Sequence, residues 1–477
     1  MDLDRTNHTI SAFHRGRKWI LVPDAAAAAT ETVEQLREWG SGPIMIVTPV
    51  EGVGDMPTPD VIRYTRASGD TQMNGIRAAL QAIEQPSADV LEAVDAFDPD
   101  HEAMVLGAGF SRASVLAGRP VYGARPEVWG ALEDKMIVDQ LWDDAGVRRA
   151  PSAVVPVADA PAAAADLALE LGTVWVADNT EGWHGGGEYA RWVRDPDDVA
   201  PSLEWFSEHA AEVRVMPFLD GIPCSIHGFA TRDGVAVFLP VEMVILRRAD
   251  RPEFVYVSAA NFWNPPAEIR DEMRAAARRV GLLLRDQYGY LGGFGIDGVC
   301  TSEGFLPTEL NPRLSKGHHL QALAAEIPLS VMELLHIEED LEISSAELEE
   351  LVVGATLNSR RGGMLLPLGG NEEPRKVGIR FIDGRAVAVD PEGVNDASMA
   401  IGPAVMGSII VMHLEADRTP IGPPIGPRSV AVIDLARQIW DLDIPSVVAA
   451  PDRCGPNAGQ DQQQGARSKE QVLTTDY

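Results

Sequence analysis

The stretch from residue 292 to residue 317 holds four polar side chains whose types and spacing could do chemistry. They are Asp297, Glu309, Asn311 and Arg313. Turn residues at 301–304 separate two apolar segments, a pattern that predicts two strands joined by a tight turn. Folding the hairpin about that turn places Asp297 directly opposite Glu309. Because Glu309, Asn311 and Arg313 are two residues apart, they share one face of their strand.

This face of the predicted hairpin would be a poor choice for structure alone. Two carboxylates directly opposite each other across strands repel. A divalent cation would relieve that repulsion, and carboxylate and amide oxygens suit Mg²⁺. The planar guanidinium of Arg313 suits a phosphate group. The pattern therefore predicts a magnesium and phosphate site, and the alternative is an ordinary hairpin with a solvated acidic face.

The same residues resemble the magnesium site of the ATP-grasp ligases. In that superfamily an acidic residue on one strand precedes Glu-x-Asn-Pro-Arg on the next, and this chain has both elements. The resemblance implies that Asp297, Glu309 and Asn311 bind Mg²⁺ against the phosphates of ATP. It also implies that Arg313 lies near the transferred phosphoryl group. Lys316, just beyond, has no firm counterpart in the family.

Lys135 is a candidate for binding the nucleotide phosphates. It lies in a segment where Leu132, Met136 and Leu141 recur at helical spacing, and Gly146 is expected to end that helix. The Asp-Lys pair, the helix and the following Ala-Gly-Val resemble the opening of the ATP-grasp fold, where the lysine reaches the phosphates. A compact ammonium suits this role. The alternative is an ordinary solvated lysine on a helix.

Three consecutive glycines, Gly185, Gly186 and Gly187, lie between two predicted strands at 173–177 and 189–193. Glycines free the backbone to bring N–H groups onto an anion. Between the lysine segment and the metal hairpin, this loop resembles the glycine-rich lid that closes over ATP. The alternative is a flexible hairpin tip.

Two further segments carry candidate residues by resemblance. The residues around Met216 and Phe218 resemble the hinge that holds adenine through backbone groups. Arg247 and Arg248 end the next long apolar strand. In several ATP-grasp enzymes a basic pair at this point faces the phosphates or the carboxylate that is activated. Exposed pairs of arginines are also common surface features.

The chain departs from the family pattern at three places. A second lysine usually precedes the glycine-rich lid, and this chain has Val176 and its neighbours there. The hinge lacks the usual glutamate, and Ile222 and Pro223 stand where an acid commonly binds the ribose. The cations that could compensate for the lysine are Arg191, Arg214 and His184.

The composition limits the partners. A net charge of −31 over 477 residues disfavours nucleic acid or an anionic membrane, because both need a positive surface. No apolar run approaches the roughly 20 residues that span a bilayer, and the N-terminal segment does not resemble a signal peptide. Three scattered cysteines (Cys224, Cys300 and Cys454) are typical of a reducing compartment. We therefore expect a cytoplasmic protein that acts on small molecules.

Other nucleotide and catalytic motifs are incomplete or missing from the sequence. Gly107 and Gly109 follow an apolar run as in a dinucleotide-binding turn, but Arg112 stands where the third glycine belongs. The sequence contains no Gly-Lys-Ser/Thr of a P-loop, no His-Glu-x-x-His of a zinc enzyme and no Gly-x-Ser-x-Gly of a serine hydrolase.

The expected fold class is α/β (α+β). In residues 1–128 short apolar runs alternate with helical stretches, which fits the Rossmann-like domain that precedes the core in ATP-grasp proteins. Residues 129–345 hold the predicted ATP-grasp core, in which a helix at 267–288 leads into the metal hairpin. A smaller α/β domain is expected at 350–447. The polar tail at 448–477 is expected to be disordered.

Over most of its length the chain resembles the pheganomycin-type peptide ligases of natural-product and antibiotic biosynthesis. The segments that carry this resemblance are residues 105–135, 181–193 and 308–317. It implies an enzyme that uses ATP and Mg²⁺ to join a small carboxylic or amino-acid derivative to the amine of an amino acid or peptide. The intermediate would be an acyl phosphate. By analogy with the superfamily the protein could form a homodimer.

Two other interpretations stay open. A catalytically inactive ATP-binding module would explain the missing lysine and hinge acid. A carboxylase-type enzyme shares the Glu-x-Asn-Pro-Arg strand, although nothing in the sequence resembles a Met-Lys-Met biotin site or the cysteine of a glutaminase.

Overall fold

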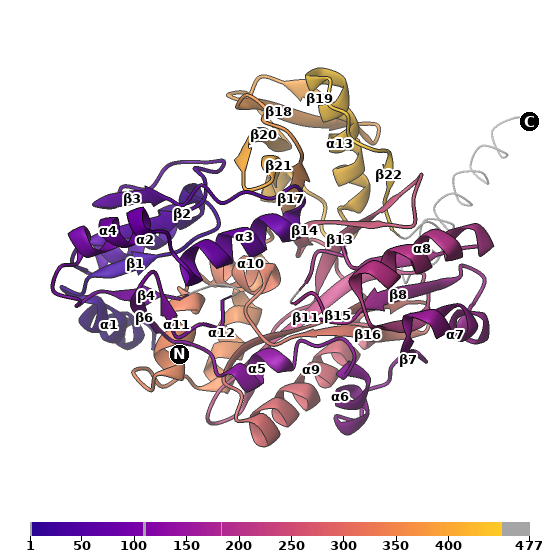
Figure 1. Ribbon diagram of the computed structural model, residues 1–477, viewed down its shortest axis with the longest axis horizontal. Helices are drawn as coiled ribbons and strands as arrows, with labels where there is room; N and C mark the ends of the chain where they lie inside the picture. Colours follow the sequence, from indigo (N-terminus) through magenta and orange to yellow (C-terminus); the bar gives the residue numbers. More distant parts are fainter. Residues whose placement is uncertain (1, 108–110, 183, 451–477) are drawn as a thin grey trace, which may run out of the picture.

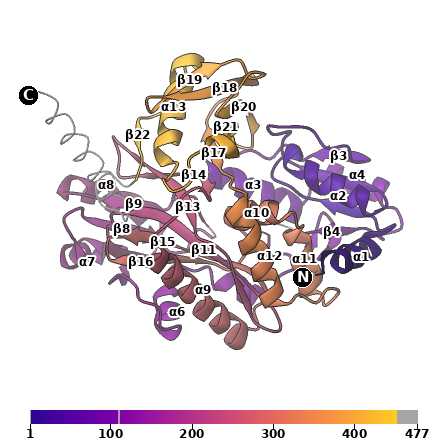
Figure 2. The same cartoon turned by 180° about the vertical axis from the view of Figure 1, so that it is seen from behind.

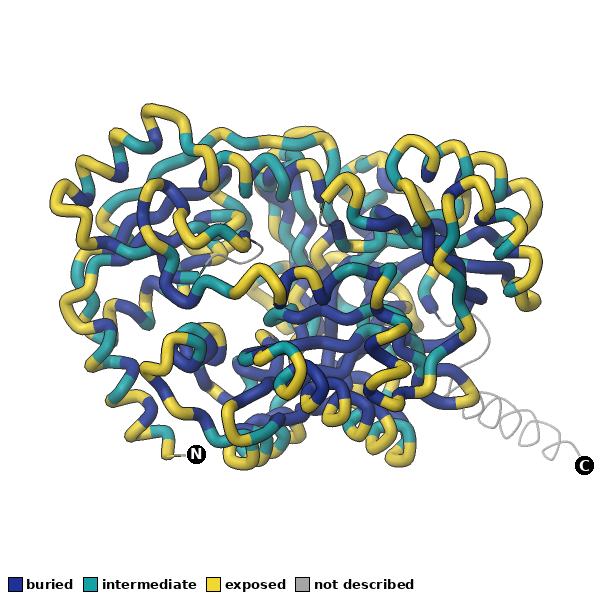
Figure 3. Tube along the Cα trace, turned by 60° about the horizontal axis from the view of Figure 1, so that its bottom comes forward, coloured by how far each residue is buried: buried dark blue, intermediate teal, exposed yellow. Residues whose placement is uncertain are grey.

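Figure 1 shows the computed structural model of the chain, which is described for residues 2–107, 111–182 and 184–450. Within these residues the strands form four sheets, which follow one another along the chain except that the last strand returns to the third sheet. We call them the N-terminal, lid, central and C-terminal sheets. The tube in Figure 3 shows buried strands inside and exposed loops and helix faces around them. Together with the flanking helices, the sheets confirm the predicted α/β fold class.

The N-terminal sheet has the strand order β3-β2-β1-β4-β6-β5. Its strands pair in parallel except for β5 with β6, which confirms the predicted Rossmann-like arrangement. Every residue of β2 is buried, as expected for a parallel strand covered on both faces. The elements are α1 (Leu3–His14), β1 (Trp19–Leu21), α2 (Thr30–Glu38), β2 (Ile44–Thr48), β3 (Val61–Tyr64), α3 (Gln72–Glu84), α4 (Ala88–Phe97), β4 (Met104–Leu106), β5 (Val115–Leu116) and β6 (Arg119–Tyr122).

The lid sheet has the order β7-β10-β8-β9. Strands β8 and β9 are the predicted pair on either side of the glycine loop, and they are antiparallel. The elements from the end of the N-terminal sheet onward are α5 (Glu127–Ala131), α6 (Val138–Asp144), β7 (Ala153–Pro156), α7 (Ala160–Leu167), β8 (Thr173–Ala177), β9 (Ala190–Val193), α8 (Pro196–His209) and β10 (Glu212–Pro217).

The central sheet contains the predicted metal hairpin, formed by β15 and β16. Its order is β14-β13-β11-β15-β16, with β12 beside β11 and β22 beside β13. Helix α9 has the predicted bounds and packs on this sheet through Met273, Ala276, Val280 and Leu284. The elements are β11 (Ile222–Ala230), β12 (Val235–Val237), β13 (Val241–Arg248), β14 (Phe254–Ala260), α9 (Ala267–Tyr288), β15 (Gly292–Thr301), β16 (Gly304–Asn311) and β22 (Val447–Val448).

The C-terminal sheet is antiparallel, with the order β17-β21-β20-β18-β19, and α13 packs beside it. Figure 1 shows this unit above the central sheet, and Figure 2 shows α10, α11 and α12 from behind, between the central and N-terminal sheets. The elements are α10 (Lys316–Ala325), α11 (Leu329–Ile337), α12 (Ser345–Asn358), β17 (Gly363–Leu368), β18 (Arg375–Ile382), β19 (Arg385–Val389), β20 (Ala397–Ala404), β21 (Gly407–Leu414) and α13 (Gly426–Trp440).

Two hydrophobic clusters join these units. In one, the N-terminal sheet packs with residues of α10, α11 and α12, such as Leu335 and Val352. In the other, Val244 and Val257 of the central sheet pack with Met399 and Ile410 of the C-terminal sheet. The packing therefore continues across the borders that the sequence predicts at 128, 345 and 350.

Val448, the first residue of the predicted polar tail, lies in the central sheet, where it forms β22 with Val447 and pairs with Arg247 of β13. The rest of the predicted tail, from residue 451, lies outside the described residues. Across the described ranges no single helix is long and apolar enough to span a membrane, and α10 and α11 reach that length only together, with a bend of 107° between them.

Candidate active site

Most of the predicted site residues line one cavity of about 580 Å³. The cavity lies between the central sheet and the lid sheet, and residues of α3 and β17 also contribute to its wall. Its size is typical of small-molecule sites. The predicted residues that line it are Lys135, Gly185, Gly186, Gly187, Met216, Phe218, Arg247, Asp297, Glu309, Asn311 and Arg313.

Asp297 and Glu309 lie directly opposite each other in β15 and β16, as the sequence predicts. Asn311 donates its amide N–H to Asp297 Oδ2 (2.9 Å), and its Oδ1 accepts from Arg313 (2.9 Å). Lys135 Nζ lies 3.1 Å from Glu309 Oε1. The ammonium offsets part of the negative charge that the hairpin brings together, and the amide links the acid pair to the arginine.

The acid pair suits a divalent cation, whereas Asn311 suits one only after its amide turns over. Carboxylate oxygens are hard ligands of the kind that Mg²⁺ prefers. In its present orientation Asn311 directs its carbonyl oxygen at Arg313 and its amino group at Asp297. Among the described residues no group of three or more His, Cys, Asp or Glu side chains is arranged to hold a metal ion. Amide, phosphate or water oxygens would therefore have to complete the coordination.

The protonation of Asp297 gives a testable pH dependence. Burial and the neighbouring Glu309 carboxylate raise the pKa of Asp297 well above its ordinary range. The folded protein then holds this proton at pH values where the unfolded chain has lost it. In the absence of Mg²⁺, this proton should therefore make the free energy of unfolding decrease as pH rises above about 4. Because Mg²⁺ competes with the proton, its affinity should rise over the same range.

Urea unfolding of the metal-free protein between about pH 5 and pH 8 measures this contribution. The free energy of unfolding of the Asp297→Asn variant should depend less on pH than that of the native protein. Calorimetry should show protons released when Mg²⁺ binds to the native protein, but not when it binds to the variant. Equal pH dependence in the two proteins would contradict the assignment of the shift to Asp297.

Lys135 lies in a turn, so the helix predicted through it is wrong. Helix α5 ends before the lysine and α6 begins after it. The reason is local, because the N–H of Met136 donates to the side chain of Asp134 (2.9 Å) and tightens the chain. Lys135 is 7% exposed and its Nζ donates to the carbonyl of His184 (3.4 Å). It is a buried cation of the cavity wall, not a solvated lysine on a helix.

The glycine loop is fixed at its base and touches the N-terminal sheet unit. Gly186 and Gly187 have positive φ (66° and 79°), which favours glycine. Nε2 of His184 lies 3.1 Å from the carbonyl of Ala177, the last residue of β8. Beyond the glycines, Glu188 Oε2 accepts the N–H of Met73 in the first turn of α3 (3.1 Å). Trp183 lies outside the described residues.

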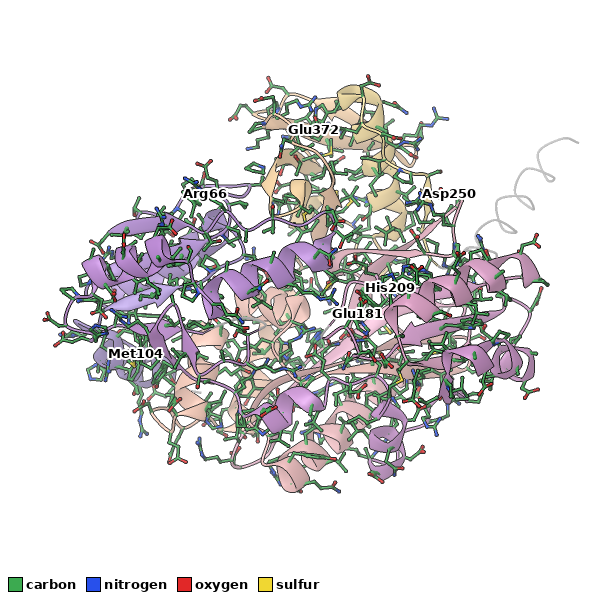
Figure 4. The ribbon with its side chains drawn as sticks, in the orientation of Figure 1. Arg66, Met104, Glu181, His209, Asp250 and Glu372 are labelled. Carbon is green, nitrogen blue, oxygen red and sulfur yellow. The ribbon has the colours of Figure 1, made fainter. Side chains whose placement is uncertain are left out.

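Figure 4 labels Glu181 and His209, which face each other beside this loop. His209 Nδ1 lies 3.1 Å from Glu181 Oε1, and the hydroxyl of Tyr189 donates to Glu181 Oε2 (2.8 Å). Arg77 of α3 donates to the same tyrosine hydroxyl (3.0 Å). The loop is therefore attached both to α8 and to α3.

The contact of Glu188 with α3 should control how tightly the loop closes. Glu188→Ala removes a charged acceptor from a helix N-terminus, a contact typically worth about 1–2 kcal/mol. We expect the Met73 amide hydrogen to exchange at least about fivefold faster, measured by hydrogen–deuterium exchange. Glu170→Ala, at an exposed position before β8, is the control and should leave that rate unchanged. An unchanged rate in Glu188→Ala would show that the contact does not hold the loop.

The predicted hinge has fewer free backbone donors than expected. Pro217 has no N–H, and the N–H of Phe218 donates to the carbonyl of Gly172 (2.9 Å). The ring of Phe218 stacks on Trp192, with centroids 4.3 Å apart, and the guanidinium of Arg247 lies 4.9 Å from the Phe218 ring centre. This edge of the cavity thus presents an aromatic and cationic surface more than a row of backbone N–H groups.

Arg248 does not reach the cavity, contrary to the prediction for the Arg247 and Arg248 pair. Successive strand residues point to opposite faces, so only Arg247 lines the cavity. Arg248 instead pairs with Asp250 (2.7 Å). Figure 4 labels Asp250 at the outer tip of the hairpin of β13 and β14.

Arg214 is the best placed of the three candidate replacements for the missing lysine. It lies directly across from Val176, the position where the lysine is expected, and both residues line the cavity. It is 1% exposed and is held by Asp139 (2.6 Å). Arg191 lies over the ring of Trp205 and does not line the cavity. Burial and the charge of Lys135 lower the pKa of His184 to about 4, so that residue is neutral.

The chain was compared with known proteins by sequence and by structure. No protein-family model matches the chain. A carbamoyl phosphate synthase large chain from Rhodopirellula baltica is 26% identical over 263 residues. That match covers 51% of this chain and 22% of the synthase chain, so this chain corresponds to about a fifth of its relative.

Two solved structures align over nearly the whole chain. A biotin carboxylase from Campylobacter jejuni, described as a complex with β,γ-ATP, has a TM-score of 0.54 at 13% identity, covering 91% of this chain and 93% of its own. The biotin carboxylase domain of the 2-oxoglutarate carboxylase of Hydrogenobacter thermophilus was solved as a dimer with Mg-ADP, ADP and bicarbonate. It has a TM-score of 0.52 at 12% identity, covering 91% of each chain. At this identity the likeness concerns the fold, and this chain has the ATP-grasp fold.

Proposed function

We propose that the chain is an ATP-dependent ligase that joins a carboxylate to an amine through an acyl phosphate, as the pheganomycin-type peptide ligases do. The observation that carries the proposal is that Lys135, the pair Asp297 and Glu309, and Arg313 meet in one cavity beside the glycine loop. Phosphoryl transfer depends on this combination of positioning and charge. A cytoplasmic homodimer in a natural-product pathway is part of the same proposal.

In the proposed reaction a carboxylate oxygen of the first substrate attacks the γ-phosphorus of ATP, the bond to the β-phosphate oxygen breaks, and ADP leaves. The amine of the second substrate then attacks the acyl carbon and loses a proton, while the bond to the phosphate oxygen breaks and phosphate leaves. Mg²⁺ bound at the acid pair would neutralise charge on the nucleotide phosphates.

The side chains of the cavity support both steps. Lys135 would neutralise phosphate oxygens, a role supported by its ammonium in the cavity wall beside Glu309. Arg313 is oriented by Glu133, whose Oε1 accepts from its Nε (2.9 Å), so its guanidinium is held where charge would develop. Closure of the loop around Gly186 would keep water from hydrolysing the acyl phosphate.

A carboxylase-type reaction is the second candidate, because the two solved structures compared above are a biotin carboxylase and a biotin carboxylase domain. Phosphorylation of bicarbonate would use the same cations and acid pair. The cavity continues past Arg313 to Lys316 and Leu365, which gives room for a substrate larger than bicarbonate. That extension supports the ligase as the first candidate.

ADP release from Mg-ATP tests the proposal. The native protein is offered a panel of carboxylic and amino acids, each with and without peptide amines, and bicarbonate as a separate arm. Turnover that needs both a carboxylate and an amine would support the ligase. Turnover with bicarbonate would favour the carboxylase-type reaction. ATP binding without ADP from any combination would instead favour the inactive binding module.

A further inference from the structure

His227 is a buried histidine that the reaction outlined above does not use. It is 2% exposed, lies in β11 of the central sheet and lines the cavity. Its Nε2 lies 3.2 Å from the hydroxyl oxygen of Ser225, whereas its Nδ1 has no hydrogen-bond partner among the described residues. Buried ring nitrogens usually have partners, so an imidazole at this position costs stability and calls for another explanation.

The backbone around His227 is shaped to hold its ring in one position. A Cβ at Gly317, in the first turn of α10, would collide with the ring. A Cβ at Gly295, which pairs with His227 across β11 and β15, would lie 3.3 Å from Cδ2 of the ring. The ring of His318 packs against it edge to face, with the ring centres 4.6 Å apart. His227 therefore has little freedom to turn away from Ser225.

Ser225 connects this histidine to the predicted metal site. It pairs directly with Asp297 across β11 and β15 and is two residues from His227, so the three side chains share one face of the sheet. Ser225 is 2% exposed and lines the cavity. Burial and the Glu309 carboxylate raise the pKa of Asp297, and a hydrogen bond from Ser225 is the first of the effects that lower it.

The ring proton of His227 decides where the Ser225 hydroxyl points. Burial and the neighbouring His318 lower the pKa of His227, so its ring is neutral and carries one proton. With that proton on Nε2, the ring donates to the serine oxygen, and the single hydroxyl proton can donate to Asp297. With the proton on Nδ1, the hydroxyl would have to turn to Nε2, and a buried N–H would lack an acceptor. Because such orphaned N–H groups are rare, the hydrogen bonding favours the proton on Nε2.

The Ser225 hydroxyl becomes more important when a metal ion binds. The carboxylate of Asp297 now accepts the amide N–H of Asn311 at 2.9 Å. Asn311 must give up that bond if its amide turns over to direct its carbonyl oxygen at Mg²⁺. Ser225 would then continue to hold the carboxylate. Groups that orient metal ligands in this way typically change metal affinity or activity by about 10- to 100-fold.

We propose that Ser225 and His227 are positioning residues for the metal site: His227 donates its Nε2 proton to Ser225, and the Ser225 hydroxyl holds Asp297 in the orientation that binds Mg²⁺. This inference rests on the metal site of the proposed function and adds two residues to it. Neither side chain has to touch the nucleotide or a substrate. Because His227 acts through Ser225, the effects of replacing the two residues depend on each other.

Binding of Mn²⁺ to the nucleotide-free protein tests the inference without any turnover. Mn²⁺ suits the same oxygen ligands as Mg²⁺, and electron paramagnetic resonance measures the free ion. His227→Leu and Ser225→Ala should each weaken Mn²⁺ binding by about 10- to 100-fold. His227→Gln keeps an amide N–H as far along the side chain as Nε2 and should restore most of the affinity. The double variant should bind no more weakly than Ser225→Ala alone.

His14→Leu is the matched control. His14 is also a buried histidine whose ring nitrogens have no hydrogen-bond partner among the described residues, but it lies in α1 and does not line the cavity. Its replacement should leave the Mn²⁺ affinity unchanged. Native affinity in His227→Leu or in Ser225→Ala would overturn the inference. A double variant whose loss of binding free energy is the sum of the two single losses would also overturn it.

The position of the ring proton is a second test, and it needs no metal ion. In protein labelled with ¹⁵N-histidine, long-range NMR correlations distinguish a proton on Nε2 from one on Nδ1, and His227→Gln assigns the signals. A proton on Nε2 would support the inference, and a proton on Nδ1 would overturn it while leaving the ligase proposal intact. Weakened Mn²⁺ binding in the variants, together with no ADP from any substrate pair, would support the positioning role and count against the ligase alone.

Discussion

Glu309→Gln should lower the rate of ADP formation by at least about a hundredfold. The substitution keeps the shape of the side chain and removes the charge that faces Lys135 at 3.1 Å and Asp297 across the hairpin. A neutral amide is a weaker ligand for Mg²⁺, and loss of one preorganised electrostatic group typically costs two to three orders of magnitude in rate. Steady-state ADP release at saturating Mg-ATP measures the effect, with folding checked by thermal unfolding.

Glu303→Gln is the matched control. Glu303 lies exposed in the turn of the same hairpin, so its replacement should keep the native rate. A Glu309→Gln protein that is folded and turns over like the native one would exclude the acid pair as the centre of the reaction.

Lys135→Met should weaken the binding of ATP and ADP by about 10- to 100-fold, because a charge-assisted hydrogen bond to phosphate is worth about 1.5–3 kcal/mol. The methionine keeps most of the volume and removes the ammonium that now lies between Glu309 and the carbonyl of His184. Calorimetric titration with Mg-ADP gives the affinity. Lys376→Met on the C-terminal sheet should bind like the native protein, and native affinity in Lys135→Met would remove the lysine from the nucleotide site.

The metal hairpin could be predicted because its information is local. The short turn pairs Thr301 with Gly304, and the register that it sets holds as far as Gly298 opposite Pro307. Continued without change, this register would place Thr308 opposite Asp297, but an irregularity between Asp297 and Gly298 shifts the pairing by one residue and brings Glu309 there. The hairpin therefore follows from local sequence, whereas the facing of Asp297 and Glu309 also depends on this irregularity. Helix α9 could be predicted for a similar reason, since the spacing of its apolar residues is local, and in the structure it ends at Gly289 in a left-handed conformation.

Two predictions are wrong where a local pattern met a competing contact: the helix through Lys135, and the placing of Arg248 in the cavity beside Arg247. The side chain of Asp134 binds the backbone of Met136 and replaces the expected helix by a turn. Arg248 follows Arg247 directly and points to the opposite face of β13, where it pairs with Asp250.

Other parts of the site depend on contacts between distant segments. Met73 of α3 and Leu365 of β17 line the cavity, and neither position has a sequence signal that would connect it to the hairpin. The choice of Arg214 among three candidate cations likewise required the pairing of β10 with β8. Such contacts follow from the packing of whole units, which periodicity in a single sequence does not specify.

The two hydrophobic clusters that cross the predicted domain borders limit where the protein can be truncated and which segments can be exchanged with other proteins. A fragment ending near residue 350 would lose Met399 and Ile410, and would leave Val244 and Val257 of the central sheet open to water. Unfolding should accordingly be cooperative across the whole chain, without a separately melting C-terminal unit. Chimaeras with other proteins of this fold should transfer β13 and β14 together with the C-terminal sheet, because Val244, Leu246, Val257 and Ala260 of those strands are part of its core.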